Sequence, residues 1–164
     1  MKRVNKIIDS PDYNLYLQRN ERAEEGRVFC KHPFEHLLAV ARLTYIILLE
    51  ENTLFISREM AYAAGLLHDI GRWQQYETGE DHAETSAKLA APLLKSAGFS
   101  RSETDLILKA IRQHRLKADS GEHRSPLSIA LCRADAYARI CFRCSVRDKC
   151  NALDSHPHSD HLEY

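Results

Sequence analysis

Apolar residues recur every three or four positions along most of the chain, the spacing that gathers them on one face of an α-helix. The clearest case follows His32-Pro33, where the recurring positions are Leu37, Val40, Ala41, Thr44 and Leu48. No segment alternates apolar and polar residues in the way a half-buried strand does. The pattern therefore predicts an all-α protein.

Capping residues and prolines mark where the predicted helices begin. Ser10-Pro11 opens one helix, Ser57 caps another, and Ser100 and Glu103 have the spacing of a capping box. Pro92 is expected to kink or split its helix. The polar segments 74–80 and 115–124 are expected to be exposed connections. The helices are predicted at about 10–24, 32–48, 57–68, 81–97, 100–114 and 125–142.

Composition limits the class of protein. A length of 164 residues predicts one domain, and 44% apolar with 28% charged residues is typical of a soluble globular protein. Lysine and arginine together number 23, as do aspartate and glutamate, so no net positive charge favours nucleic acid. No apolar run suggests a membrane span, and residues 1–9 lack the apolar core of a signal peptide. The cytoplasm is thus expected, where cysteines are thiols or metal ligands rather than disulfides.

Histidines and aspartates fall near the ends of the predicted helices. Taken singly, each histidine would be read as a surface or hydrogen-bonded core residue, and His68 near Gly71 as an ordinary helix C-terminus. Taken together they form an ordered set of imidazoles and carboxylates, which suits Fe, Mn, Zn or Ni, whereas Mg favours oxygen ligands. The set is His36, His68, Asp69, His82, His114 and Asp135.

This order resembles the HD-domain superfamily of metal-dependent phosphohydrolases over about residues 28–140. The anchors are HLLAVAR at His36, LLHDIGR at His68-Asp69 and CRADAYAR at Asp135. DHAETSA at His82 and AIRQHR at His114 match the two extra histidines of the dinuclear branch. That branch includes hydrolases like symmetrical diadenosine tetraphosphatase, cyclic-dinucleotide phosphodiesterases and a few di-iron oxygenases.

The resemblance implies a compact HD-domain bundle of about six or seven helices and a site for one or two divalent ions, Fe or Mn in the first place. The Asp69 carboxylate is expected to bridge the two ions. The implied organisation is an N-terminal helical extension (1–27), the HD domain (28–142) and a cysteine-containing C-terminal extension with a polar tail (143–164). His156, His158 and His161 lie in this tail, which is expected to be disordered.

The expected activity is hydrolysis of a nucleotide or another small phosphoester by a metal-activated hydroxide. An anionic substrate needs cations. Arg72 and Arg139 are the first candidates, because Arg72 closely follows His68-Asp69 (the HD pair) and Arg139 closely follows Asp135. Lys31 and His32 are weaker candidates, and all four would also be acceptable as surface charges. The alternatives are a di-iron oxygenase with the same six ligands and a metal- or redox-sensing module.

A second candidate metal site lies in ICFRCSVRDKC, which places Cys141, Cys144 and Cys150 in a C-x2-C-x5-C pattern. Cys132 shares a predicted helix with Cys141 and would lie roughly 13 Å from it, too far for one tetrahedral ion. Cys30 is a better fourth ligand, because it precedes His36 by as many residues as Cys141 follows Asp135. Some uncharacterised HD-domain proteins resemble this chain in VFCKHPFEH and in the cysteine cluster. Structural zinc is the first interpretation, with a 4Fe–4S cluster or free thiols as alternatives.

Overall fold

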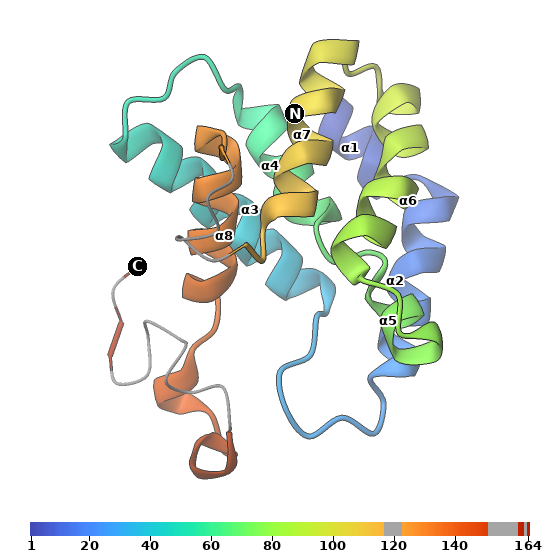
Figure 1. The fold of residues 1–164 in the computed structure, drawn as a ribbon, viewed down its shortest axis with the longest axis vertical. Helices are drawn as coiled ribbons and strands as arrows, with labels where there is room; N and C mark the ends of the chain where they lie inside the picture. The colour runs from blue at the N-terminus through green and yellow to red at the C-terminus, as the bar shows by residue number, and fades with distance from the viewer. Residues whose placement is uncertain (117–122, 151–160, 163) are drawn as a thin grey trace.

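The fold is a bundle of α-helices, seen in a computed structural model that describes residues 1–116, 123–150, 161–162 and 164. No β-strand occurs in the described part of the chain, which confirms the predicted all-α class. In these residues no helix has both the length and the apolar character needed to cross a bilayer. The elements, shown in Figure 1, are α1 (Lys2–Ile8), α2 (Pro11–Ala23), α3 (Phe34–Glu50), α4 (Arg58–Leu67), α5 (Arg72–Thr78), α6 (His82–Ala97), α7 (Arg101–Gln113), α8 (Pro126–Tyr137) and the 3₁₀ turns η1 (Cys141–Arg143) and η2 (Arg147–Lys149).

Helix α4 lies at the centre of the bundle and packs against α1, α3, α6, α7 and α8. Its sequence, REMAYAAGLL, has small residues where neighbouring helices come closest. At Gly65 a Cβ atom would lie only 2.4 Å from the Cα atom of Ala41 on α3. The glycine thus allows α3 and α4 to touch backbone to backbone, and α4 ends at the His68-Asp69 pair.

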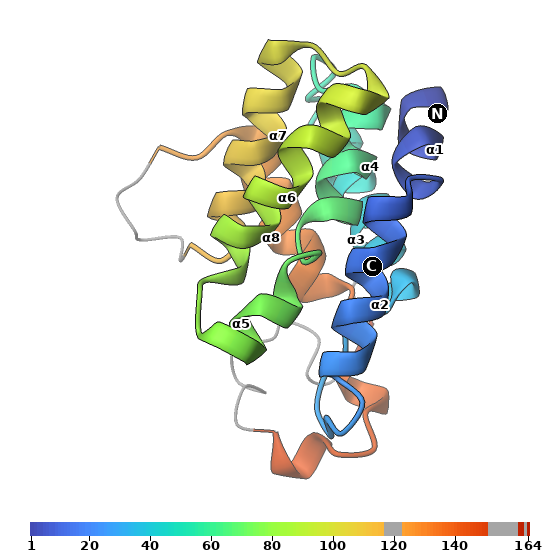
Figure 2. The same cartoon turned by 90° about the vertical axis from the view of Figure 1, so that its right-hand side faces the viewer.

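Helices α6 and α7 pack against each other and against α4 (Figure 2). The predicted capping box is present, because Ser100 and Glu103 exchange side-chain and backbone hydrogen bonds. Pro92 lies inside α6, which continues through it as one helix, so the helix is not split there. Pro92 and Lys88 both face solvent, so water can take the hydrogen bond that the carbonyl of Lys88 loses.

The N-terminal residues pack into the same core. Helix α1 was not predicted, yet Val4 and Ile7 are fully buried. Tyr13 of α2 is also buried and donates a hydrogen bond from its hydroxyl to the carbonyl of Leu66 (3.3 Å). Arg3 pairs with Glu59 and Glu103 and so ties α1 to α4 and α7. Helix α1 therefore contacts the start of α4, and α2 contacts the end of α4 that leads to His68 and Asp69.

Two predicted boundaries were wrong. Segment 74–80 was expected to be an exposed connection, but most of it belongs to α5, which Trp73 anchors by its burial. Its polar sequence carries no apolar period that would have revealed it. The last helix ends at Tyr137 rather than near Phe142, because the backbone turns away from helical geometry at Ile140. Cys141 therefore lies in η1, at the same end of the molecule as the turn between α2 and α3 (Figures 1 and 2).

Replacing Gly65 by alanine should destabilise the fold by about 1–3 kcal/mol, because the new methyl group meets the backbone of α3 and cannot be relieved by a rotamer change. Chemical denaturation of the variant and the wild type measures the difference. Gly26→Ala is the matched control, since an added Cβ there meets nothing within 4 Å. Equal stability of the Gly65 variant and the wild type would contradict the close packing of α3 on α4.

Candidate metal centre

The six predicted ligands converge from five helices. His36 lies in the first turn of α3, His82 is the first residue of α6, and Asp135 lies in α8. His68 and His114 are the C-caps of α4 and α7, and Asp69 follows His68 directly. Helix ends can point side chains along the helix axis into a common space, which explains why ligands from distant segments meet here.

One half of the centre joins α3, α4 and α8. The Nε2 atom of His36 lies 3.1 Å from Oδ1 of Asp135, and the Nε2 atom of His68 lies 3.7 Å from the same oxygen. His68 Nε2 is also 3.4 Å from Oδ2 of Asp69. Ligand atoms of His36, His68 and Asp69 lie within 4.8 Å of one another, which is close enough to hold one ion.

The other half joins α6 and α7 to the same aspartate. The Nε2 atoms of His82 and His114 lie 3.0 and 3.8 Å from Oδ1 of Asp69 and 3.4 Å from each other. These three residues form a second group with ligand atoms within 4.8 Å. Asp69 thus presents one carboxylate oxygen to each half of the centre.

Backbone carbonyls fix the ring orientations of His68 and His114 by accepting hydrogen bonds at Nδ1. Nδ1–H of His68 donates to the carbonyl of Gly65 (2.7 Å), and Nδ1–H of His114 donates to the carbonyl of Ile111 (2.6 Å). Both bonds leave Nε2 facing the centre. Metal-binding histidines are commonly oriented in this way, by an oxygen that takes the other ring proton.

The carboxylates and most of the imidazoles are in the forms that bind metal. Burial would raise the pKa of Asp69, but His68 and the other facing imidazoles hold it well below its ordinary value. Burial lowers the pKa of His36 and His82, and lowers that of His114 to about 4. Burial opposes the protonation of His68, yet Asp69 and Asp135 raise its pKa to about 10. The two carboxylates therefore make the position beside His68 Nε2 attractive to a cation.

Buried polar atoms at the centre lack hydrogen bonds, which is the condition a bound ion would satisfy. Within the described residues, Nε2 of His36, Nε2 of His68 and Oδ1 of Asp69 are fully buried and make no hydrogen bond. Desolvated groups of this kind cost roughly 1–3 kcal/mol each when they stay unpaired. The donor set, its convergence and these atoms together fit a divalent metal site.

The two predicted cations both contact ligands. Arg139 donates from Nη2 to Oδ1 and Oδ2 of Asp135 (3.0 and 3.3 Å). Arg72 lies against the ring of His82, with Nη1 2.8 Å from Nε2, and its Nη1 is 4.0 Å from Oδ1 of Asp69. Arg139 therefore orients the Asp135 carboxylate, and Arg72 lies beside His82 and Asp69.

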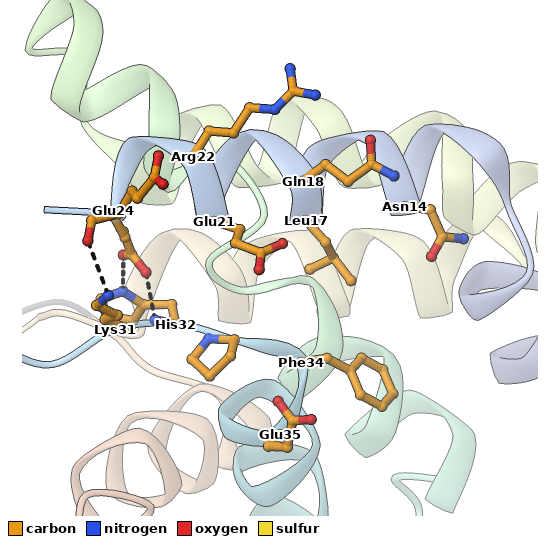
Figure 3. A pocket seen from close by; sticks show the side chains of 12 residues that line it. Asn14, Leu17, Gln18, Glu21, Arg22, Glu24, Lys31, His32, Phe34 and Glu35 are labelled. Carbon is orange, nitrogen blue, oxygen red and sulfur yellow. Dashed lines mark hydrogen bonds and ion pairs between the residues drawn. The ribbon is translucent and has the colours of Figure 1, made fainter. Parts of the chain in front are cut away.

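Sequence reasoning missed the contribution of α2. Asn20 is buried and donates from Nδ2 to the backbone carbonyl of Asp69 (2.8 Å), while its Oδ1 accepts the N–H of Trp73 (2.8 Å). It therefore holds the turn that carries the HD pair. His32, taken as a possible surface charge, is buried and bound to Glu24 (Figure 3). The four-residue spacing between His32 and His36 was the one signal that could have pointed to it.

The four candidate cysteines line one pocket of about 460 Å³ beside His36. Arg139 also lines this pocket, and its interaction with Asp135 joins the pocket to the centre. Burial, and after it the neighbouring Cys30, raises the pKa of Cys141. In the described chain no three of the sulfurs come within 4.8 Å of one another, and all five cysteines are free thiols. His156 and His158 lie outside the described residues.

Known proteins resemble this chain over most of its length. An uncharacterized protein of Clostridium beijerinckii is 37% identical over 151 residues, which is 92% of each chain. The crystal structure of a predicted HD superfamily hydrolase from an uncultured Thermotogales bacterium matches with a TM-score of 0.61 and 29% identity. The match covers 79% of this chain and 67% of that one.

Two enzymes are similar over shorter regions. Ribonuclease Y of Aquifex aeolicus is 32% identical over 102 residues, 62% of this chain and 16% of that enzyme. The bifunctional uridylyltransferase/uridylyl-removing enzyme of Erythrobacter litoralis is 35% identical over 68 residues, 42% of this chain and 7% of the enzyme. The family model described as the HD domain matches residues 34–140, which span the region from the first histidine of the centre to its last aspartate. The chain belongs to the HD-domain family.

Proposed function

We propose that the protein is a metal-dependent phosphohydrolase of the dinuclear HD type, which cleaves a nucleotide or another small phosphoester. The observation that carries the proposal is the position of Asp69, whose two oxygens face separate groups of imidazoles. One ion would be held by His36, His68, Asp69 and Asp135, and the second by Asp69, His82 and His114. The mixture of nitrogen and oxygen donors favours Fe or Mn over Mg.

Bound divalent ions would supply a water of lowered pKa and neutralise charge on the phosphoryl group. The residues of the chain provide the surroundings that this chemistry needs. Arg139 keeps both oxygens of Asp135 in place, and Arg72 does the same for the ring of His82. His68, His82 and His114 are buried, so bulk water is kept from the far side of the centre.

The charges around the centre indicate the side from which an anionic substrate enters. The pocket of about 460 Å³ beside His36 is lined by four cations, Lys31, Arg139, Arg143 and Arg147. A larger pocket of about 610 Å³, shown in Figure 3, is lined by four carboxylates, Glu21, Glu24, Glu25 and Glu35, against the two cations Arg22 and Lys31, of which Lys31 lines both pockets. The first attracts a phosphate group and the second repels it. We therefore place the substrate in the pocket beside His36.

The cationic pocket is also the reason for preferring a hydrolase over the two alternatives. A di-iron oxygenase would use the same six ligands, so the ligand set does not separate the two activities. The pocket beside His36 offers a phosphoryl group several charged partners. A metal- or redox-sensing module would need no such pocket at the centre.

Asp69→Ala should abolish both the retention of Fe or Mn at the His/Asp centre and hydrolysis, because it removes the carboxylate that both ions share. The measurements are metal content after gel filtration and phosphate release from a panel of nucleotides and phosphomonoesters with Mn or Fe. Asp105→Ala is a matched control, because Asp105 is exposed on α7. A folded Asp69 variant that still retains Fe or Mn as the wild type does would contradict the proposed centre. A wild-type protein with a mixed-valence di-iron signal and no turnover of phosphoesters would favour the oxygenase.

Lys31→Ala and Arg143→Ala should each raise the KM for a phosphoester roughly 2–5-fold with little change in kcat. Both side chains are exposed at the rim of the cationic pocket, where a charge contributes less than about 1 kcal/mol. The increase should shrink at high ionic strength, because salt screens exposed charges. Arg58→Ala, which removes an exposed charge at the start of α4, serves as the control. Unchanged KM values would show that the substrate enters elsewhere.

We also propose that Cys30, Cys141, Cys144 and Cys150 bind a second metal, with zinc as the first choice and a 4Fe–4S cluster as the alternative. They come from two segments with little secondary structure and line one pocket. The backbone N–H of Cys144 donates to the carbonyl of Cys141 (3.0 Å), which closes the C-x2-C turn. Zinc would have to draw the sulfurs to about 4 Å from one another.

Elemental analysis of the Asp69→Ala protein should find one zinc per chain, since that variant keeps only the cysteine site. Adding Cys144→Ser should remove this zinc, because three thiolates bind it less tightly than four. Cys132→Ser is the control, as Cys132 lies in α8 outside the pocket lining. Iron with an equal amount of labile sulfide would instead identify a cluster. Neither metal in anaerobically purified protein would show that the thiols are free.

A further inference from the structure

His32 is held as rigidly as the predicted ligands, although it lies outside the region that matches the HD domain. It belongs to the turn before α3 and is 2% exposed. Glu24, the C-cap of α2, is equally buried and binds it twice. Oε2 accepts the backbone N–H of His32 (2.7 Å), and Oε1 faces its Nδ1 (2.5 Å), as Figure 3 shows.

The contacts of Glu24 fix which ring nitrogen carries the proton. Oε1 also accepts a hydrogen bond from the hydroxyl of Tyr76 (2.9 Å). A carboxylate with several donors around it is an acceptor, so Nδ1 of His32 supplies N–H. The Nε2 atom on the other side of the ring then presents its lone pair.

That Nε2 atom points into the metal centre and makes no hydrogen bond within the described chain. It lies 3.6 Å from Oδ2 of Asp69, the oxygen that His68 Nε2 approaches to 3.4 Å. A separation of 3.6 Å is too long for a hydrogen bond. It suits two atoms that share an ion, since bonds of about 2.0–2.2 Å place such atoms at most about 4.4 Å apart.

The arrangement repeats that of the two C-cap histidines. In His68 and His114 an oxygen holds Nδ1 and leaves Nε2 facing Asp69. Glu24 plays the part for His32 that a backbone carbonyl plays for the other two. A carboxylate in this role also increases the donor strength of the imidazole.

We infer that His32 is a further protein ligand of the ion on the Oδ2 side of Asp69, with Glu24 as the residue that orients it. This inference rests on the proposed metal centre. His32 forms no group with His36, His68 and Asp69 in which all ligand atoms lie within 4.8 Å, so at least one of its distances to the other ligand atoms exceeds 4.8 Å. Binding one ion would therefore require His32 and the other ligands to move together by at least about 0.4 Å, until their ligand atoms lie at most about 4.4 Å apart.

The additional ligand would make the two ion positions unequal. The ion near Oδ2 would have His32, His36, His68, Asp69 and Asp135, whereas the other would have three protein ligands. A position with three imidazoles selects Fe, Mn or Zn more strongly against Mg. The first ion would then be retained permanently, and the second would exchange and leave more coordination positions open to water and substrate.

The test is metal affinity, measured by competition with a chromophoric chelator on the full-length protein. His32→Ala should weaken one of the two ions by at least 10–100-fold, the loss typical even for a residue behind a ligand, and leave the other unchanged. Added imidazole should restore the lost affinity by filling the space of the missing ring. Glu24→Gln should weaken the same ion by a smaller factor. Glu21→Gln is the matched control, because Glu21 lines the same pocket in Figure 3 without contacting His32.

Each outcome decides the matter. Unchanged affinity for both ions in folded His32→Ala protein would overturn the inference, as would a loss that imidazole does not restore. If the alanine variant fails to fold, His32→Asn and the electronic spectrum of cobalt-substituted protein replace it. An unchanged cobalt spectrum would then refute the inference. A wild-type protein that binds no divalent ion would instead refute the proposed metal centre itself. Neither readout depends on hydrolysis.

Discussion

The buried carboxylate of Asp69 is the constraint on which the structure depends. It is 1% exposed, and burial of an unpaired charge costs several kcal/mol. The bundle compensates by directing imidazoles from α4, α6 and α7 at its two oxygens. Because these rings come from different helices, the helices must meet at one point. The burial of the Asp69 carboxylate therefore depends on the packing of α4, α6 and α7 against one another.

The packing of α4 makes this meeting point possible. Gly65 lets α3 approach the backbone of α4, which brings His36 close to the end of the helix where the HD pair lies. The same residue offers its carbonyl to Nδ1 of His68. Gly71 likewise allows a close approach, here to α6. Its N–H donates to the hydroxyl of Ser86, and an added Cβ would lie 2.7 Å from the backbone nitrogen of Ser86. Small residues on both sides of the pair thus set its distance from two other helices, α3 and α6.

The N-terminal helices supply the support behind the centre. Asn20 holds the carbonyl of Asp69, Tyr13 holds that of Leu66, and Glu24 binds His32. These contacts come from a region that precedes the match to the HD domain. The N-terminal segment therefore helps to position the residues of the candidate centre. The pocket that it lines is acidic, unlike the cationic pocket beside His36.

The sequence by itself determined the all-α class, the helix starts at Ser57 and Ser100, and the order of the six candidate ligands, because periodicity, caps and short motifs are local properties. It did not determine α1, α5 or the end of α8, whose stability comes from contacts rather than from a pattern. Only the tertiary structure decided that His32 faces the centre, since this depends on α2 bringing Glu24 beside a turn that has no regular structure of its own. It likewise decided that Arg139 holds Asp135, because a helical spacing shows which residues share a face but not which charge that face will meet.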